Sequence, residues 1–182
     1  ENAQELAQGG ALDDTTLGGY GELHYEGGDT DQVDFHRFVL FVGHRFNDWI
    51  TLYSELELEH AFTAGDGSSS GEVELEQAFI DFALSEDTNG RVGVILVPMG
   101  ILNETHEPNT FFGTERNNVE KNIIPSTWWE AGGMLSNRWE NGFSTDLFLS
   151  SGLEVVTGGS SGYVVRDGRG KISKQTARDP AA

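Results

Sequence analysis

The chain has 182 residues and a formal net charge of -19, from 30 acidic side chains against 11 lysines and arginines. This charge argues against a nucleic-acid partner, and it makes contact with an anionic surface costly unless divalent cations bridge the two. Only 37% of the residues are hydrophobic, and no apolar run reaches the roughly 20 residues of a membrane-spanning helix, which excludes an α-helical membrane protein. There is no cysteine, so neither a disulfide nor a thiolate metal site is possible.

Residues 1–15 are polar, and we expect them to form a lead-in without chemistry of its own. No charged start is followed by an apolar stretch, so this segment is not a signal peptide. We expect it to be the front of a mature or trimmed exported chain. A glycine-rich strand is predicted next, over Thr16–Glu26, and a second over Val33–Phe46, which ends in the turn pair Asn47-Asp48.

The third predicted strand, Trp49–His60, has the clearest pattern in the chain. Successive strand side chains point to opposite faces of a sheet, so its alternation predicts one apolar and one acidic face. The apolar set is Ile50, Leu52, Leu56 and Leu58, and the other set is Thr51, Tyr53, Glu55, Glu57 and Glu59. Its length matches the 9–11 tilted residues with which a strand crosses a bilayer.

A polar loop over residues 65–71 precedes the fourth predicted strand, Glu72–Leu84. In a straight strand, Glu72, Glu74 and Glu76 would share a face with apolar residues that follow them. Either a β-bulge near Gln77 re-aims the strand, which we favour, or part of the acidic stretch lies beyond the membrane. The fifth predicted strand, Arg91–Val97, is apolar on both faces. We expect the segment 98–126 to fold inward and cover one of these faces, although a buried strand of a soluble core would have the same composition.

The sixth and seventh strands are predicted over Thr127–Asn137 and Phe143–Ser151, joined by a short turn. Connections after strands two, four and six are short, whereas those after three, five and seven are long. This alternation is typical of a chain that crosses an outer membrane up and down. Aromatic residues beside the short turns fit an interfacial girdle, namely Phe46, Trp49, Trp139 and Phe143. The sequence therefore predicts an all-β fold, an antiparallel up-and-down transmembrane β-barrel, over residues 16–152.

Several short motifs resemble the phosphate-selective porin O and P family of bacterial outer-membrane channels. They are Arg37-Phe38, Arg91-Val92-Gly93, Val97-Pro98-Met99-Gly100, Phe112, Glu115-Arg116, Ile124-Pro125 and Trp129-Glu130-Ala131-Gly132. The resemblance covers Leu17 to Leu153, and it implies a trimeric barrel of about sixteen strands whose third outer loop narrows the pore. Seven strands would then be the N-terminal portion of the barrel, with residues 153–182 as an extracellular loop at a truncated end.

Anion preference in that family comes from basic residues in the pore, for which this chain offers Arg37, Arg116 and Lys121. The matching strand positions are mostly acidic or neutral, so a general or cation-biased channel is predicted instead. The predicted pore-lining residues are Tyr20, Glu22, His24, Arg37, Tyr53, Glu55, Glu57, Glu59, Glu74, Glu76 and Asp146. The predicted constriction-loop residues are Glu104, Glu107, Glu115, Arg116 and Lys121.

The chain is thus expected to be a homotrimeric porin of the bacterial outer membrane, in contact with lipid, that passes small ions and hydrophilic solutes without a cofactor. The five histidines offer no close metal-ligand spacing, and the nearest group, Glu104, His106 and Glu107, is expected to be a surface loop and not a metal site. No catalytic motif is present, although a periplasmic enzyme stays a third possibility. The main alternative is a soluble all-β carbohydrate-binding or adhesion domain with a leucine core and Trp128 and Trp129 as stacking platforms.

Overall fold

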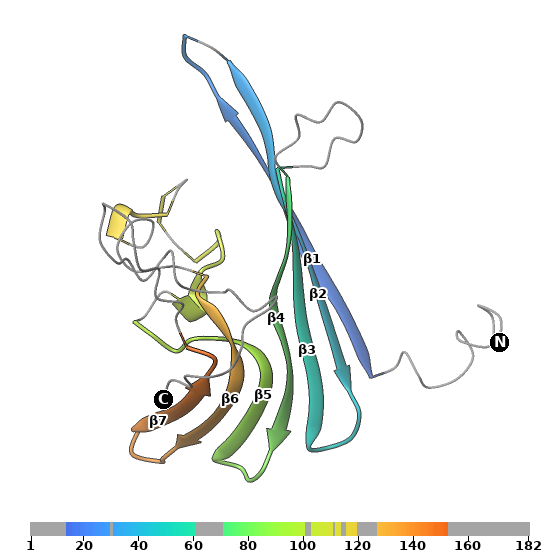
Figure 1. Cartoon of the computed structure of the whole chain (residues 1–182), viewed down its shortest axis with the longest axis vertical. Helices are drawn as coiled ribbons and strands as arrows, with labels where there is room; N and C mark the ends of the chain where they lie inside the picture. The colour runs from blue at the N-terminus through green and yellow to red at the C-terminus, as the bar shows by residue number, and fades with distance from the viewer. Residues whose placement is uncertain are drawn as a thin grey trace, which may run out of the picture. The chain divides into compact units, whose positions relative to one another are not determined.

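The computed structural model describes residues 14–29, 31–60, 71–100, 103–110, 112–113, 116–119 and 127–152. Its seven strands form one sheet in which every strand lies beside its neighbours in the sequence (Figure 1). The strands are β1 (Thr15–Glu26), β2 (Gln32–Arg45), β3 (Ile50–Glu59), β4 (Glu72–Ala83), β5 (Thr88–Leu96), β6 (Trp129–Arg138) and β7 (Ser144–Ser150). A short 3-10 helix, η1 (Asn103–Thr105), follows β5. No helix in these ranges is long and apolar enough to span a membrane.

The prediction of an all-β, antiparallel up-and-down sheet is confirmed, and all seven predicted strands are present. Over the described ranges the sheet is open, with β1 and β7 at its edges, so closure into a barrel does not follow from it. Two strand ends differ from expectation. β5 begins at Thr88 because the carbonyl of Thr88 accepts hydrogen bonds from the N–H groups of Leu84 and Ser85 in a tight turn. β6 begins after Thr127, whose φ of 56° is incompatible with a strand. Residues 1–13 and 153–182 lie outside the described ranges.

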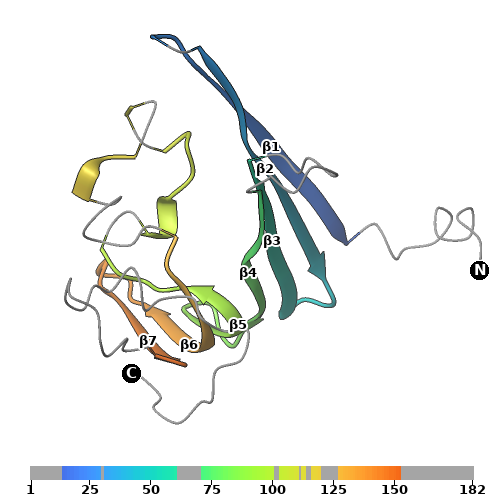
Figure 2. The same ribbon diagram turned by 45° about the horizontal axis from the view of Figure 1, so that its top comes forward.

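The chain divides into two compact units, residues 1–81 and 82–182, and β4 runs from one into the other. In the first unit, β1 and β2 form a hairpin that continues past the end of β3 (Figures 1 and 2). The register explains this extension, since Arg37 of β2 pairs with Glu59 at the end of β3, while residues 32–35 pair with β1 alone.

A β-bulge interrupts β2 at His36. Glu22 of β1 pairs with Arg37 and Leu23 pairs with Phe35, which leaves His36 as an extra residue between them. An extra residue shifts the alternation by one position. Val33 and Phe35 before the bulge therefore share a face with Phe38 after it, and the charged side chains stay together on the opposite face.

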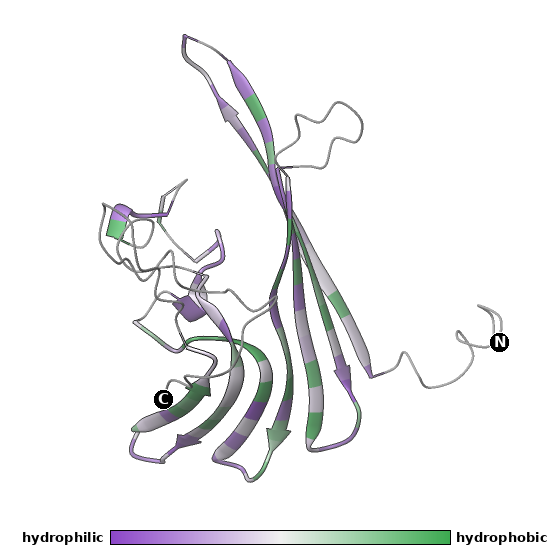
Figure 3. Ribbon diagram, in the orientation of Figure 1, coloured by the Kyte–Doolittle hydropathy of each residue, from purple (hydrophilic) through white to green (hydrophobic). Residues whose placement is uncertain are grey.

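Hydrophobic and hydrophilic residues alternate along the strands of the first unit (Figure 3), and its two faces differ sharply in exposure. One face leaves its apolar side chains open to the surroundings, for example Leu17 at 74% exposure. Its other exposed apolar members are Leu23, Tyr25, Val33, Phe35, Phe38 and Leu56. The opposite face buries Arg37, Glu55 and Glu57. This arrangement is the reverse of a sheet that packs a hydrophobic core.

The second unit repeats the pattern on its own strands. Leu135 pairs with Leu147 across β6 and β7, and Gly133 pairs with both Val92 and Leu149. The side chains of Val92, Leu135, Leu147 and Leu149 are all exposed. The other face carries Ile95, which is 1% exposed, and Met134, which is also buried. Each unit therefore presents one exposed apolar face and one polar or covered face.

Aromatic side chains lie beside two of the short connections, as expected. Phe46 and Trp49 flank the turn between β2 and β3, and both are exposed. Trp139 and Phe143 flank the turn between β6 and β7, with ring centroids 5.2 Å apart. The backbone N–H of Trp139 donates to the carbonyl of Phe143 at 2.9 Å, so the turn itself brings this pair together.

Gly132 of β6 allows the close approach of β7, and this predicts a selective effect of substitution. A Cβ at Gly132 would lie 2.2 Å from the carbonyl oxygen of Leu149, a backbone atom that cannot move aside without distorting the pair. At the adjacent Gly133 the nearest such atom is 3.6 Å away, an ordinary contact. Gly132→Ala should lower the free energy of unfolding by about 1–3 kcal/mol, measured by denaturant unfolding, whereas Gly133→Ala should be close to neutral. Equal effects of the two would contradict this account of the β6–β7 pair.

Candidate functional site

The polar face of the first unit brings together most of the predicted pore-lining residues. The register pairs Tyr20 with Val39, Glu22 with Arg37, and Arg37 with Glu59, so alternate positions of β1, β2 and β3 fall on this one face. Directly opposed residues share a side of the sheet. The predicted residues on it are Tyr20, Glu22, His24, Arg37, Tyr53, Glu55, Glu57 and Glu59. Glu76 of β4 joins them through its contact with Glu57.

An aromatic row crosses this face, with one ring from each of β1 to β4. The ring centroids of Tyr20 and Phe41 are 6.3 Å apart, those of Phe41 and Tyr53 are 6.3 Å apart, and those of Tyr53 and Phe79 are 5.4 Å apart. Phe41 and Phe79 are not among the residues predicted to line the polar face. The sequence does indicate this position for Phe41, because it lies four residues after Arg37 in the same strand and therefore points to the same face.

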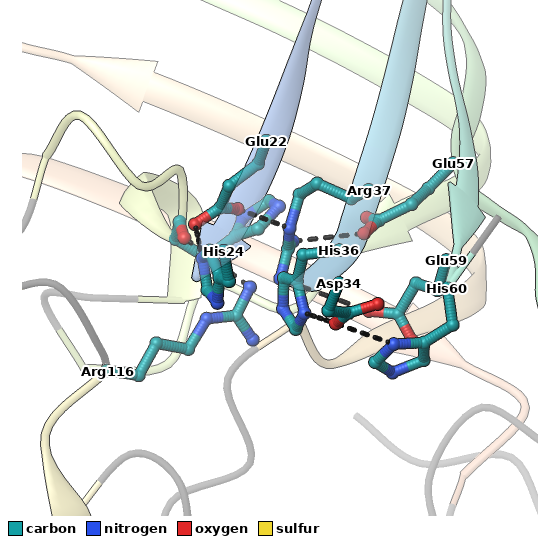
Figure 4. Close-up of polar contacts among 10 residues, drawn as sticks. Glu22, His24, Asp34, His36, Arg37, Glu57, Glu59, His60 and Arg116 are labelled. Carbon is teal, nitrogen blue, oxygen red and sulfur yellow. Dashed lines mark hydrogen bonds and ion pairs between the residues drawn. The ribbon is translucent and has the colours of Figure 1, made fainter. Parts of the chain in front are cut away.

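Arg37 lies at the centre of a charged row one step further along the strands (Figure 4). Its Nε is 2.9 Å from Glu22, its Nη1 is 3.0 Å from Glu57, and its Nη2 is 3.9 Å from Glu59. The contacts to Glu22 and Glu57 are ion pairs and not aligned hydrogen bonds. Since one guanidinium faces three carboxylates, the row keeps a negative balance.

The glutamates of β3 continue the acidic face toward β4. Glu55 and Glu57 are each 1% exposed, and Glu76 is also buried. Gln77 donates a hydrogen bond to Glu55 at 2.6 Å, while its neighbour Glu76 contacts Glu57. Consecutive residues of a regular strand point to opposite faces, so these two contacts from Glu76 and Gln77 are what a bulge at this point would give.

Three histidines gather beyond the charged row. The rings of His24 and His36 stack with centroids 4.4 Å apart, and the ring of His60 meets that of His36 edge-on at 5.2 Å. Asp34 accepts from both His36, at 3.1 Å, and His60, at 3.0 Å. The histidines have no close ligand spacing along the sequence, as expected. In the folded chain, however, His36 and His60 lie together beside Asp34, so the expectation is wrong for the structure.

The polar face of the second unit holds a hollow of about 280 Å³. Its lining includes Arg91 of β5, Ser136 of β6 and Asp146 of β7, and Glu104 of η1. Ser136 donates to Asp146 at 2.6 Å. Asp146, predicted to line a pore, and Glu104, predicted to belong to the constriction loop, thus meet in one polar hollow. The first turn of the segment after β5 therefore lies over this polar face, as an inward-folding loop requires.

Asn103 fastens that turn to the sheet. Its side-chain NH₂ donates to the carbonyls of Val97, at 2.7 Å, and Trp128, at 2.8 Å, and its side-chain oxygen accepts from the N–H of Trp128 at 2.7 Å. Asn103 is 2% exposed. The clamp satisfies backbone groups of both chain segments that lead into and out of residues 98–126. No sequence motif marked this asparagine.

The remaining predicted loop residues have mixed outcomes. The carbonyl of Glu107 accepts from the hydroxyl and the N–H of Thr110, and Arg116 reaches the carbonyl of His106 at 3.5 Å. His106 is buried and hydrogen-bonded to the carbonyl of Asn103 at 3.0 Å, so the expectation of a surface histidine was wrong. Glu115 and Lys121 lie outside the described ranges. Glu74 is half-buried in β4.

Trp128 also differs from the stacking platform of the alternative prediction. It is buried, and its indole N–H donates to Glu130 at 3.0 Å. The second carboxylate oxygen of Glu130 accepts from Ser151 at 2.8 Å. Glu130 therefore joins the start of β6 to the end of β7, and Trp128 has a packing role in the second unit.

Comparison with known proteins assigns no function to these faces. No protein-family model matches the chain, and no solved structure matches it. A segment of 121 residues is 45% identical to an uncharacterized protein of Aquifex aeolicus (strain VF5). The match covers 64% of this chain and 28% of that protein, so the chain spans less than a third of the relative's length. None of these findings points to the phosphate-selective porins.

The Asn103 clamp predicts that one loop substitution is far more costly than another. Asn103→Ala would leave the buried N–H and carbonyl of Trp128 and the carbonyl of Val97 without these partners, and we expect a loss of about 2 to 3 kcal/mol in unfolding free energy. Asn117→Ala is the matched control, because Asn117 makes an exposed turn contact to the N–H of Val119, and it should cost about 1 kcal/mol or less. Denaturant unfolding and limited proteolysis near residues 98–126 would measure both. Comparable losses would refute the clamp.

Proposed function

We propose that this chain forms part of a bacterial outer-membrane porin, a passive channel for small ions and hydrophilic solutes with a bias toward cations. The observation that carries the proposal is the inverted character of the sheet. In each unit the apolar side chains of alternate positions on one face are exposed, as in Leu147 at 67%, and in the first unit the charged side chains of Arg37, Glu55 and Glu57 on the other face are buried. Lipid is the environment in which an outward-facing leucine row is stable.

A water-soluble sheet would bury these same leucines. Contiguous exposed apolar faces beyond a few hundred Å² are rare in soluble monomers and mark contact with lipid or a partner. Here the exposed set spans all of the strands from Leu17 to Leu149. The soluble carbohydrate-binding alternative needs the reverse arrangement, with the leucines inside and tryptophans outside, so the exposures favour the porin.

Connection lengths support the same proposal. The strands are joined after β2, β4 and β6 by residues 46–49, 84–87 and 139–143, whereas residues 60–71 and 97–128 separate β3 from β4 and β5 from β6. Outer-membrane barrels have short periplasmic turns and longer external loops, with aromatic girdles at the interfaces. In this proposal Phe46, Trp49, Trp139 and Phe143 lie at the periplasmic interface.

The proposed barrel requires more strands than these seven. An open sheet edge in lipid leaves backbone N–H and C=O groups unpaired at several kcal/mol each. The Aquifex relative is more than three times as long as the matched segment, which provides the length that such a barrel needs. A barrel of about sixteen strands and a trimeric assembly, as in the family the sequence resembles, belong to this proposal.

Electrophysiology of the complete gene product tests the proposed function. The purified protein should need detergent to stay monodisperse, and it should give stepwise conductance in planar bilayers. A protein that stays monodisperse in plain buffer and gives no conductance would overturn the proposal and restore the soluble all-β alternative.

The acidic face predicts the sign of the selectivity. Rings of carboxylates favour cations, so replacing Glu55, Glu57 and Glu59 together by glutamine should move the reversal potential in a salt gradient toward anion preference. The control is Glu86→Gln in the exposed β4–β5 turn, which removes a carboxylate away from this face and should leave selectivity unchanged. No shift in the triple variant would mean that this face does not line the pore.

A further inference from the structure

Asp34, His36 and His60 converge at the outer end of the polar face of the first unit (Figure 4). One carboxylate oxygen of Asp34 lies 3.1 Å from Nδ1 of His36 and 3.0 Å from Nδ1 of His60. All three atoms lie within 4.8 Å of one another. Two imidazole nitrogens and a carboxylate oxygen are a ligand set that proteins use for divalent transition metals.

Two backbone irregularities produce this convergence. The bulge at His36 adds a residue to β2, and it places His36 on the same face as Asp34 and Arg37. His60 has a φ of 52° at the end of β3, a left-handed conformation that is uncommon outside glycine. The N–H of His60 donates to the carbonyl of His36 at 2.9 Å. One hydrogen bond thus fixes both irregular residues beside each other, with their Nδ1 atoms toward Asp34.

The spacing of the three atoms is close to that of a metal site. With bonds of about 2.0–2.1 Å, neighbouring ligands in a tetrahedral zinc site lie roughly 3.3 Å apart. Two of the three separations here are already within a few tenths of an ångström of that value, at 3.0 and 3.1 Å. The third separation, between the two imidazole nitrogens, is at most 4.8 Å.

We propose that Asp34, His36 and His60 bind a divalent transition-metal ion of the zinc class, with water in the remaining position. The side chains are half-buried at Asp34 and His36 and exposed at His60, so an ion can enter from the His60 side. The carboxylates of Glu22, Glu57 and Glu59 nearby favour a cation. The site does not depend on whether the sheet forms a channel.

Arg37 opposes metal binding, and this gives the proposal a specific signature. Nη2 of Arg37 lies 3.1 Å from Nε2 of His36, so Nε2 accepts and Nδ1 carries the proton donated to Asp34. A metal on Nδ1 requires the proton to leave Nδ1 and Nε2 to carry one instead. The N–H of His36 Nε2 and the N–H of Arg37 Nη2 would then be two donors facing each other, so the hydrogen bond between Arg37 and His36 must break. Removal of the guanidinium should therefore tighten binding.

His24 is expected to support the site without binding the metal. Its Nε2 lies 2.6 Å from Glu22, and its ring stacks flat on that of His36. The stacking fixes the plane of the His36 ring. A metal site with His24 as a ligand would require loss of this stack, because parallel rings at 4.4 Å do not direct their nitrogens at one ion.

Zinc titration of the full chain by calorimetry, in detergent where the chain needs it, tests the site. The wild type should bind one Zn²⁺ per chain, and extended X-ray absorption at the zinc edge should show two imidazole nitrogens. Asp34→Asn and His60→Gln should each weaken binding by at least about tenfold. His44→Gln is the control, since His44 lies on the same β2 strand but bonds to Thr15 at 2.8 Å, and it should bind as the wild type does.

Arg37→Gln completes the experiment, with circular dichroism to establish that each variant folds and Arg37→Met in its place if it does not. Binding several-fold tighter than in the wild type supports the assigned Nδ1 coordination. Three outcomes overturn the proposal. These are the absence of stoichiometric binding, equal affinity of His60→Gln and His44→Gln, and a zinc coordination sphere of carboxylate oxygens alone.

Discussion

The bulge at His36 is the constraint on which the polar face of the first unit depends. Side chains alternate with a period of two, so a single register slip moves a whole set to the opposite face. Without the extra residue, Val33 and Phe35 would share a face with Arg37, and Asp34 would lie among leucines. With it, the apolar set stays on one side from Val33 to Phe38. The separation of apolar from charged side chains over the whole β1–β2 hairpin therefore depends on one unpaired residue, His36.

That separation places several carboxylates close together on one face, and Arg37 offsets part of their negative charge. Like charges opposite each other destabilise a sheet, and breaking a buried ion pair by removing one partner typically costs 3–5 kcal/mol because the other charge stays uncompensated. Arg37 touches carboxylates from two neighbouring strands, Glu22 of β1 and Glu57 of β3. It therefore links three strands as well as neutralising charge. Gln77 of β4 donates a hydrogen bond to Glu55 of β3, which links these two strands without neutralising the charge of Glu55.

Period-two alternation, turn residues and connection lengths together were sufficient to predict seven antiparallel strands in chain order, although β5 is apolar on both faces. The alternation also contains a sign of the bulge in β2 that was not used for prediction. Val33 and Phe35 have odd numbers, whereas Phe38, Leu40 and Val42 have even numbers. This parity change marks the bulge in β2, in the same way that the glutamates of β4 predict one near Gln77. By contrast, the meeting of Asp34 with His60 and the clamp at Asn103 depend on register and on a loop's path. Local patterns along the sequence contain neither.

The rise per residue of β2 sets the distances between the three groups of side chains on the polar face. Along β2, His36 belongs to the histidine group, Arg37 to the charged row and Phe41 to the aromatic row. At about 3.3 Å per residue, the charged row and the aromatic row lie roughly 13 Å apart. A cation moving along this face would leave a carboxylate and imidazole site, pass carboxylates held by one guanidinium, and then meet aromatic rings. Carboxylates attract the cation, while ring faces offer it a weaker, non-coordinating surface. In the proposed channel, the carboxylate and imidazole groups of Asp34, His36 and His60 would therefore attract a cation before it reaches the level of the aromatic rings.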